Sequence, residues 1–179
     1  FQGYRRANGK FGTRNYIGIV STVNCSATTS KYAADKFDRE VLSQFANVDG
    51  VVPLIHKGGC AIQYGGEDHQ QLTRTLANVA RHPNIGAYIV IGLGCETAQA
   101  SFLMENGGLV QLGNSPSPNQ PLVMNIQEQG GVAKTVARAV DKIRELLPEI
   151  NRAKREPIPV SELMLGLECG GSDGNSGTT

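Results

Sequence analysis

The chain has 179 residues, 40% of them hydrophobic, which suits one domain with a buried core. A formal net charge of +1 with 18% charged residues provides no basic field for nucleic acid and no acidic tail. No apolar run approaches the roughly 20 residues of a membrane span, and no segment resembles a signal peptide. We therefore expect a cytoplasmic protein with reduced thiols, and neither nucleic-acid nor membrane partners.

Strand and helix patterns alternate along the chain. Residues 1–14 are polar and glycine-rich, which predicts a loop leading into the first strand. Apolar, β-branched runs predict five strands, at residues 15–24, 51–55, 86–94, 122–126 and 162–167. Apolar residues at helical spacing predict four helices, at residues 26–45, 67–81, 96–105 and 132–147. Ser26 or Thr28 would cap the first helix, and Pro148 would end the last.

This order of elements predicts an α/β fold. We expect an open, doubly wound, mainly parallel sheet of about five strands with helices on both faces, a Rossmann-like arrangement in three layers. Residues 15–179 would form a single domain. Both ends of the chain look cut, so we expect this domain to be excised from a longer protein.

Four cysteines follow the predicted strands at nearly regular spacing. Cys25, Cys60, Cys95 and Cys169 are separated by 35, 35 and 74 residues, and a strand with its crossover helix takes roughly 30 or more. Parallel strands end on one side of a sheet, where ligands bind, so the four thiols are expected to face one crevice. The spacing matches no zinc-finger or ferredoxin motif, so a shared metal site is an inference from topology. The alternative is that the cysteines are buried core residues.

Other reactive side chains accompany the thiols. Asn24 and Ser26 flank Cys25 at a predicted helix start, where hydroxyls or a carboxylate of a substrate can bind; a helix cap beside a structural cysteine is the alternative. His56 and Lys57 precede Cys60 and can supply a base and a carboxylate anchor. Glu96 follows Cys95 and is a candidate for acid–base work, although the helix dipole favours an acid there regardless of function.

Two further acidic or hydroxylated residues, Ser172 and Asp173, follow Cys169. Polar groups in a buried loop are costly without partners, which makes these two candidates for substrate contacts; a disordered end is the alternative.

Three other ionisable residues are not expected at the crevice. Arg14 precedes the first strand by enough residues to lie roughly 30 Å from Cys25, at about 3.3 Å per residue, so we expect it to brace a loop. A role in substrate binding would require another subunit or a further domain. His82 precedes the third strand and is expected on the same side as Arg14, and His69 lies within a predicted helix and is given no role.

The strings GYRRANGKFGTRNYIGIVSTVNCSA, VDGVVPLIHKGGC, HPN, IGLGCE and LMLGLECGGSDGNSG occur in this order along nearly the whole chain. Together they resemble the altronate/galactarate dehydratase family, and TRNYIGIVSTVNCSA most resembles its altronate branch. Members of the family are longer, so this chain would be a central portion. The resemblance implies dehydration of a sugar acid to a 2-keto-3-deoxy acid, with the help of a divalent metal ion, typically iron(II).

Such an elimination requires three kinds of chemical group. Removing the proton next to a carboxylate builds negative charge that a metal or cation must stabilise, a base must reach the C2 proton, and an acid must help the C3 hydroxyl depart. We expect His56 as base or ligand and Glu96 as its acid–base counterpart. The remaining candidates are substrate contacts at Asn24, Ser26, Lys57, Ser172 and Asp173, and iron ligands at Cys25, Cys60, Cys95 and Cys169.

The expected partners are a small sugar acid, the remaining domains of the same chain and further copies in a homo-oligomer. Two other functions stay open. Some relatives resemble sulfolactate sulfo-lyases, which eliminate sulfite instead of water. The chain can also be a metal- or ligand-binding module with no activity of its own.

Overall fold

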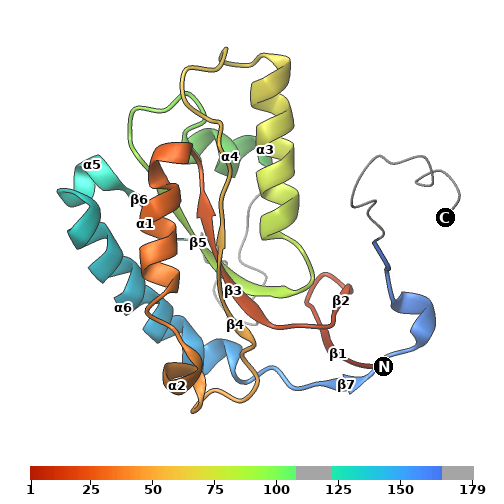
Figure 1. The fold of residues 1–179 in the computed structure, drawn as a ribbon. Coiled ribbons are helices and arrows are strands. Elements are labelled where there is room, and N and C mark those ends of the chain that lie inside the picture. Colours follow the sequence, from red (N-terminus) through yellow and green to blue (C-terminus); the bar gives the residue numbers. More distant parts are fainter. Residues whose placement is uncertain (108–121, 167–179) are drawn as a thin grey trace, which may run out of the picture.

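Four parallel strands form the central sheet of the protein, whose computed structural model describes residues 1–107 and 122–166 (Figure 1). They are β3 (Tyr16–Ser21), β4 (Gly50–Leu54), β5 (Ile85–Gly92) and β6 (Val123–Asn125). Their order across the sheet is β4-β3-β5-β6. β4 lies on one side of β3, and β5 and β6 lie on the other, so the chain reverses its direction across the sheet after β4. Ligands of open α/β sheets bind at such a reversal, outside the carboxyl ends of the strands.

Helices cover both faces of this sheet, which gives three layers (Figure 1). α1 (Asn24–Ala34) and α6 (Val132–Ile150) lie on one face, and α3 (Glu67–Ala80) and α4 (Ala100–Gly107) on the other. Alternate strand residues serve the two faces: Ile19 and Ile89 pack with α1 and α6, whereas Val20 and Val90 pack with α3 and α4. Burial on both faces explains why these strands are apolar throughout rather than alternating.

The first residues of the chain belong to a second, smaller sheet. β1 (Gln2–Arg5) lies between β2 (Phe11–Gly12) and β7 (Glu156–Pro157), and both neighbours are antiparallel to it. The prediction of a loop over residues 1–14 is therefore wrong for β1 and β2. β1 pairs with β7, which is distant in the sequence, and a strand of four residues is too short to show a periodic pattern of apolar residues.

A buried arginine attaches this small sheet to the main domain. Arg6 is 8% exposed and donates hydrogen bonds to the Pro83 carbonyl (2.7 Å), the Asn15 side-chain oxygen (2.9 Å) and the Arg14 carbonyl (2.9 Å). Asn15 is fully buried and donates to the Ile150 carbonyl at 3.1 Å. Arg6 and Asn15 thus brace the amino ends of β3 and β5, on the side of the sheet opposite the strands' carboxyl ends.

The sheet has four strands in the described residues, not the five predicted. Residues 163–166 are not a strand; they follow a short 3₁₀ helix, η1 (Val160–Glu162), and Met164 is 94% exposed. Their apolar pattern is typical of a buried strand, but nothing in the described chain covers them.

The helices also differ from their predicted bounds. The predicted helix over residues 26–45 is two helices, because Asp38 caps a separate α2 (Arg39–Leu42) by accepting a hydrogen bond from the Val41 N–H. α1 begins after Val23, not at Ser26 or Thr28. Pro148 does not end α6, which continues to Ile150. Near a helix end a proline removes only one backbone hydrogen bond, which the buried apolar face of α6 tolerates.

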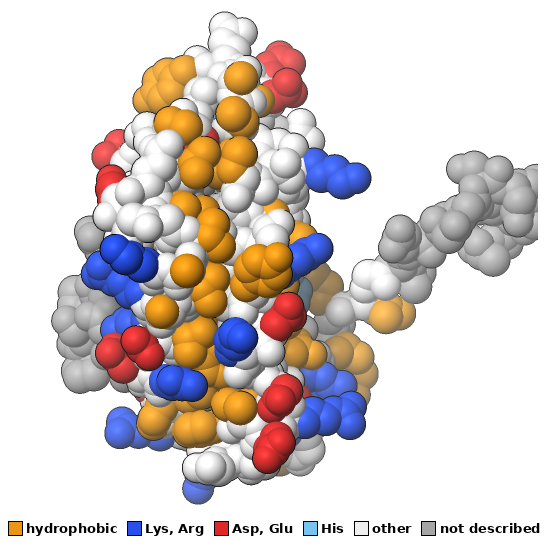
Figure 2. Space-filling model, turned by 60° about the vertical axis from the view of Figure 1, so that its left-hand side comes forward, with side chains coloured by type: hydrophobic (Ala, Val, Ile, Leu, Met, Phe, Trp, Pro, Cys, Tyr) orange, Lys and Arg blue, Asp and Glu red, His pale blue; other side chains and the backbone are white. Residues whose placement is uncertain are grey.

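Two features concern the outside of the molecule. Figure 2 shows hydrophobic side chains in a band along the side where α1, α5 (Ile126–Gln129) and α6 lie, with charged side chains on its flanks. Tyr32 on α1 is 54% exposed and Val132 on α6 is 43% exposed. Within residues 1–107 and 122–166, no helix combines the length and the apolar character that crossing a membrane requires.

Candidate functional site

Three of the four cysteines lie where the sequence predicts them, at the carboxyl ends of successive strands. Cys25 is in the first turn of α1 after β3, Cys60 is in the loop between β4 and α3, and Cys95 is in the loop between β5 and α4. All three are exposed and unpaired. The alternative that they are core residues is therefore wrong for these three. Cys169, Ser172 and Asp173 lie outside the described residues.

The thiols do not assemble into a metal site in this part of the chain. Among the residues described, no three His, Cys, Asp or Glu side chains come together in a way that could hold a metal ion. Thiolates favour iron and zinc, but one ion needs several donors at once. The described residues alone therefore do not fit an iron(II) centre, and the four-cysteine site stays a prediction that involves the part beyond them.

Glu96 is the best-connected side chain at this edge of the sheet. It is 2% exposed, and its carboxylate accepts hydrogen bonds from the Thr22 hydroxyl (2.6 Å), the Leu93 N–H (3.1 Å) and the Gly94 N–H (2.6 Å). Thr22 follows β3, and Leu93 follows β5. The carboxylate therefore ties the junction between β3 and α1, beside Cys25, to the loop after β5 that contains Cys95, across the reversal of the sheet.

The pKa of Glu96 reflects these bonds. Burial alone raises the pKa of a carboxyl group, but the hydrogen bonds from Thr22 and from the backbone of Glu96, Gly94 and Leu93 outweigh burial and lower it. Glu96 is consequently ionised at neutral pH. An ionised carboxylate that accepts three hydrogen bonds can hold a loop or accept a proton, but it has no proton to donate.

His56 is also bound to the backbone. Its Nδ1 accepts a hydrogen bond from the Gly58 N–H (3.1 Å), which assigns the ring proton of the neutral side chain to Nε2. Nε2 then donates to the Ser21 carbonyl at the end of β3 (3.0 Å). The half-buried ring thus fastens the β4–α3 loop to β3, and its lone pair becomes available to a substrate only when Gly58 moves away.

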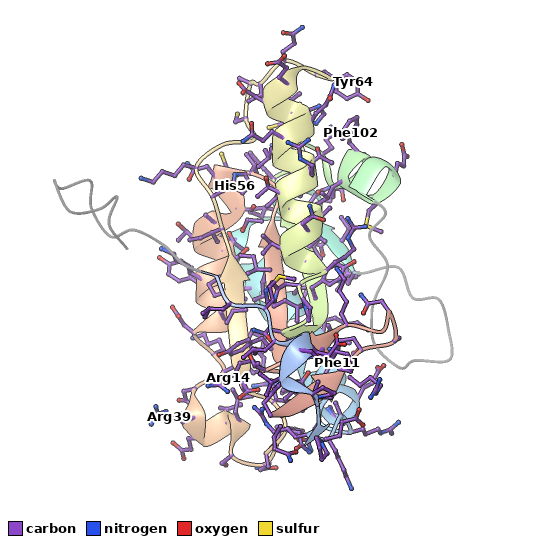
Figure 3. All side chains as sticks on the ribbon, turned by 90° about the vertical axis from the view of Figure 1, so that its right-hand side faces the viewer. Phe11, Arg14, Arg39, His56, Tyr64 and Phe102 are labelled. Carbon is purple, nitrogen blue, oxygen red and sulfur yellow. The ribbon has the colours of Figure 1, made fainter. Side chains whose placement is uncertain are left out.

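The other predicted contacts divide into exposed and buried groups. Asn24 and Lys57 are exposed, and the Asn24 N–H donates to the Gly58 carbonyl at 2.9 Å. Ser26 is fully buried, and its hydroxyl donates to the Val23 carbonyl at 2.9 Å, so the structure does not bring it to the surface with Asn24. Figure 3 shows His56 toward one end of the sheet and Arg14 toward the other. Arg14 lies near Asp49 there, as a loop-bracing residue does.

Gly59 allows the β4–α3 loop to lie against the β3–α1 loop. Its φ is +97°, and a Cβ at this position would lie 2.5 Å from the Thr22 carbonyl oxygen. Its own carbonyl accepts a hydrogen bond from Ala98, which follows Glu96. Gly59 therefore joins all three loops of the site, and only glycine combines this φ with this close approach.

We expect Gly59→Ala to lower the free energy of unfolding by about 3 kcal/mol, since an unfavourable φ costs about 1–2 kcal/mol and the clash with Thr22 adds to it. Gly65→Ala is the matched control, because Gly65 has a φ of +72° but open space around its Cβ position. Urea unfolding followed by circular dichroism measures both. Equal losses in the two variants would show that the close approach to Thr22 contributes nothing.

A shallow cleft of about 250 Å³ adjoins Glu96 on the α4 side of the sheet. Tyr64 and Phe102 form its aromatic wall, and their ring centroids are 5.3 Å apart. Behind them the buried His69 stacks on Phe102 at 4.1 Å. Figure 3 shows Tyr64 and Phe102 toward the same end of the molecule as His56. The cleft thus opens near the carboxyl ends of the strands.

Sequence reasoning missed Thr22 and the two aromatic residues of the cleft. Thr22 lies inside the predicted first strand, and a polar residue at the carboxyl end of a buried strand is the signal that could have identified it. Tyr64 and Phe102 carry no such signal, because they lie on separate segments that meet only in the folded chain.

Comparison with known proteins agrees with the resemblance seen in the sequence. The altronate dehydratases of Bacillus subtilis (strain 168) and Escherichia coli (strain K12) are 37% and 38% identical to this chain over 179 and 176 residues. The galactarate dehydratase (L-threo-forming) of Escherichia coli (strain K12) is 36% identical over 182 residues. These matches cover 100%, 98% and 100% of this chain but 34%, 33% and 34% of the relatives, so the chain spans about a third of their length.

Residues 3–151 match the family domain described as D-galactarate dehydratase/altronate hydrolase, second domain. This stretch contains the whole central sheet and the three loops at its carboxyl edge. The chain therefore belongs to the D-galactarate dehydratase/altronate hydrolase family.

Proposed function

We propose that this chain is the domain of a sugar-acid dehydratase that binds its substrate at the carboxyl ends of β3, β4 and β5, with altronate as the substrate. The observation that carries the proposal is the exposure of Asn24, Lys57 and the three thiols at that one edge of the sheet, in a chain of this family. The product would be a 2-keto-3-deoxy acid. A cytoplasmic location, contacts with the remaining domains of the longer chain and a homo-oligomeric state are further parts of the proposal.

The substrate carboxylate would be anchored first. Lys57 is exposed beside the crevice, and the amino end of α1 at Asn24 presents the positive end of a helix dipole. Both favour the carboxylate, and more so as negative charge grows on it when the neighbouring C2 proton leaves.

Proton transfer would follow at His56. The lone pair on its Nδ1 can accept the C2 proton once the bond to the Gly58 N–H opens, which the conformational freedom of this glycine permits. Glu96 fits the part of acid–base counterpart less well than the sequence suggests, since its carboxylate is ionised and already accepts three hydrogen bonds. We therefore propose that Glu96 serves mainly by holding the loops in place. If Cys169 joins Cys25, Cys60 and Cys95 as the sequence predicts, these thiolates would hold an iron(II) ion, which would supply a Lewis acid for the carboxylate or the leaving hydroxyl.

Turnover by the full-length protein tests this proposal. We expect anaerobic incubation with altronate to yield a 2-keto-3-deoxy acid, measured by its reaction with semicarbazide, and incubation with sulfolactate to release no sulfite. Release of sulfite with no reaction on any sugar acid would favour the sulfo-lyase function. The isolated residues 1–179, assayed in parallel, decide whether this domain alone is active or is only a binding module.

A further inference from the structure

We infer that the cleft beside Glu96 binds the uncharged, hydroxylated end of the substrate, and that Glu105 in it selects aldonic acids, with one carboxylate, over aldaric acids, with a carboxylate at each end. This inference rests on the proposed function and names its substrate class. Altronate is an aldonic acid and galactarate an aldaric acid, so it also distinguishes between the activities of the two kinds of relative.

The position of the cleft connects it with the candidate site. Glu96 lines the cleft, and its carboxylate is hydrogen-bonded to Thr22 at the end of β3. The loop between β5 and α4, which contains Glu96, also contains the exposed Cys95. A chain of six carbons with its carboxylate near Lys57 and α1 would therefore extend past Glu96 into the cleft. A volume of about 250 Å³ is below the roughly 300–1,000 Å³ of drug-sized sites and suits part of a small molecule.

The walls of the cleft have the chemistry of a site for a polyhydroxylated chain. Thr97, Gln99 and Ser101 line it and provide hydroxyl and amide groups that both donate and accept hydrogen bonds. Tyr64 and Phe102 provide apolar faces against which carbon-bound hydrogens of such a chain can pack.

The aromatic wall is held in place from behind. His69 is fully buried, accepts a hydrogen bond from the Gly65 N–H through Nδ1 (3.0 Å), and stacks on the Phe102 ring. Gly65 directly follows Tyr64, which is 70% exposed and whose ring centroid lies 5.3 Å from that of the His69 ring. A wall that is ordered before binding loses little conformational entropy when the ligand arrives.

The charge of the cleft decides which end of the substrate it accepts. Two carboxylates, Glu96 and Glu105, lie in its lining, and none of the described residues that line it is Lys, Arg or His. Juxtaposed like charges are unfavourable, so the second carboxylate of an aldaric acid is repelled there. The terminal hydroxyl of an aldonic acid can instead donate a hydrogen bond to Glu105.

Glu105→Lys in the full-length protein tests the inference. We expect the ratio of kcat/KM for galactarate to kcat/KM for altronate to rise at least about fivefold, and Glu105→Gln to raise it by a smaller factor, because the repulsion is removed or reversed. Glu40→Lys is the matched control: this exposed carboxylate lies on α2, outside the cleft, and the same change of charge there should leave the ratio unchanged.

An unchanged ratio in Glu105→Lys, with both acids turned over, overturns the inference and leaves the proposed function intact. Failure of the wild-type protein to act on either acid counts against the proposed function. In that case isothermal titration calorimetry of the same variants with the two acids tests the role of Glu105. A fivefold rise in the affinity for galactarate relative to altronate in Glu105→Lys supports the inference. Equal relative affinities in wild type and Glu105→Lys contradict it.

Discussion

Replacing Glu96 by Gln is expected to lower the free energy of unfolding by about 2–3 kcal/mol, because bonds to a charged group are worth about 1.5–3 kcal/mol each and the loss is partly compensated. The amide has one oxygen where the carboxylate has two. Its NH₂ group would face backbone donors at Leu93 or Gly94, which now bond to Oε1 and Oε2. Chemical unfolding at pH 7 measures the loss. Glu162→Gln, at an exposed residue of η1, is the control and should change the free energy by less than about 0.5 kcal/mol.

The pH dependence of the same variant gives an independent check. The pKa of Glu96 is lower in the folded protein than its ordinary value of 4.5, so its contribution to stability is complete above that value. The contribution is lost as the pH falls below 4.5 and through the lowered pKa. The difference in stability between wild type and Glu96→Gln should therefore shrink on going from pH 7 to pH 3. A difference in the free energy of unfolding that stays constant over this range would contradict the inference that ionised Glu96 holds the loops together.

Thr22 separates a holding role of Glu96 from a role in proton transfer. Thr22→Val removes the hydroxyl that donates to Glu96 but leaves the carboxylate, whereas Thr22→Ser keeps the hydroxyl. If Glu96 holds the loops, Glu96→Gln and Thr22→Val both lower kcat without changing the shape of its pH profile, and Thr22→Ser restores the rate. If Glu96 transfers a proton, only Glu96→Gln removes a limb of the profile.

The sequence predicts the place of the candidate site better than its internal bonds. Apolar runs mark β3, β4 and β5, and Cys25, Cys60 and Cys95 follow each of them, so the edge of the sheet at which they gather follows from local patterns and from the rules of parallel sheets. The hydrogen bond between Thr22 and Glu96 joins residues 74 positions apart, and that between His56 and Ser21 joins residues 35 apart. No periodicity within one element encodes such a pairing, so the holding roles of Glu96 and His56 do not follow from local patterns.

The wrong prediction of a fifth strand has a related physical cause. An apolar run is typical of a segment that another part of the protein buries, but the run does not identify that part. Met164 and Leu165 are 94% and 77% exposed, and the family match ends at residue 151, before this run. The sheet of this domain therefore does not explain the pattern over residues 162–167, and the prediction of a strand is wrong for residues 162–166.

Replacing Arg6 by Met is expected to lower the free energy of unfolding by about 3 kcal/mol or more. The change leaves three acceptors without their donor, and an unsatisfied buried group costs about 1–3 kcal/mol. These acceptors are the carbonyls of Pro83 and Arg14 and the side-chain oxygen of Asn15. Arg6→Lys should recover only part of the loss, because one ammonium group cannot reproduce the three directions of a guanidinium.

The neighbouring arginine provides the control for this prediction. Arg5 forms an ion pair with Glu156 at 2.6 Å, but its side chain is 59% exposed. Exposed ion pairs contribute about 0–1 kcal/mol, so Arg5→Met should cost far less than Arg6→Met in urea unfolding. Similar losses in the two variants would mean that the small sheet, and not the buried contacts of Arg6, sets the stability of this end of the domain. Arg6 lies at the amino ends of the strands, opposite the proposed substrate site. We therefore expect the full-length Arg6→Met variant to have the KM of the wild type for altronate at a temperature where the variant stays folded. Arg6 and Asn15 at the amino ends of the strands would then serve the scaffold, whereas the residues at the carboxyl ends would serve the chemistry.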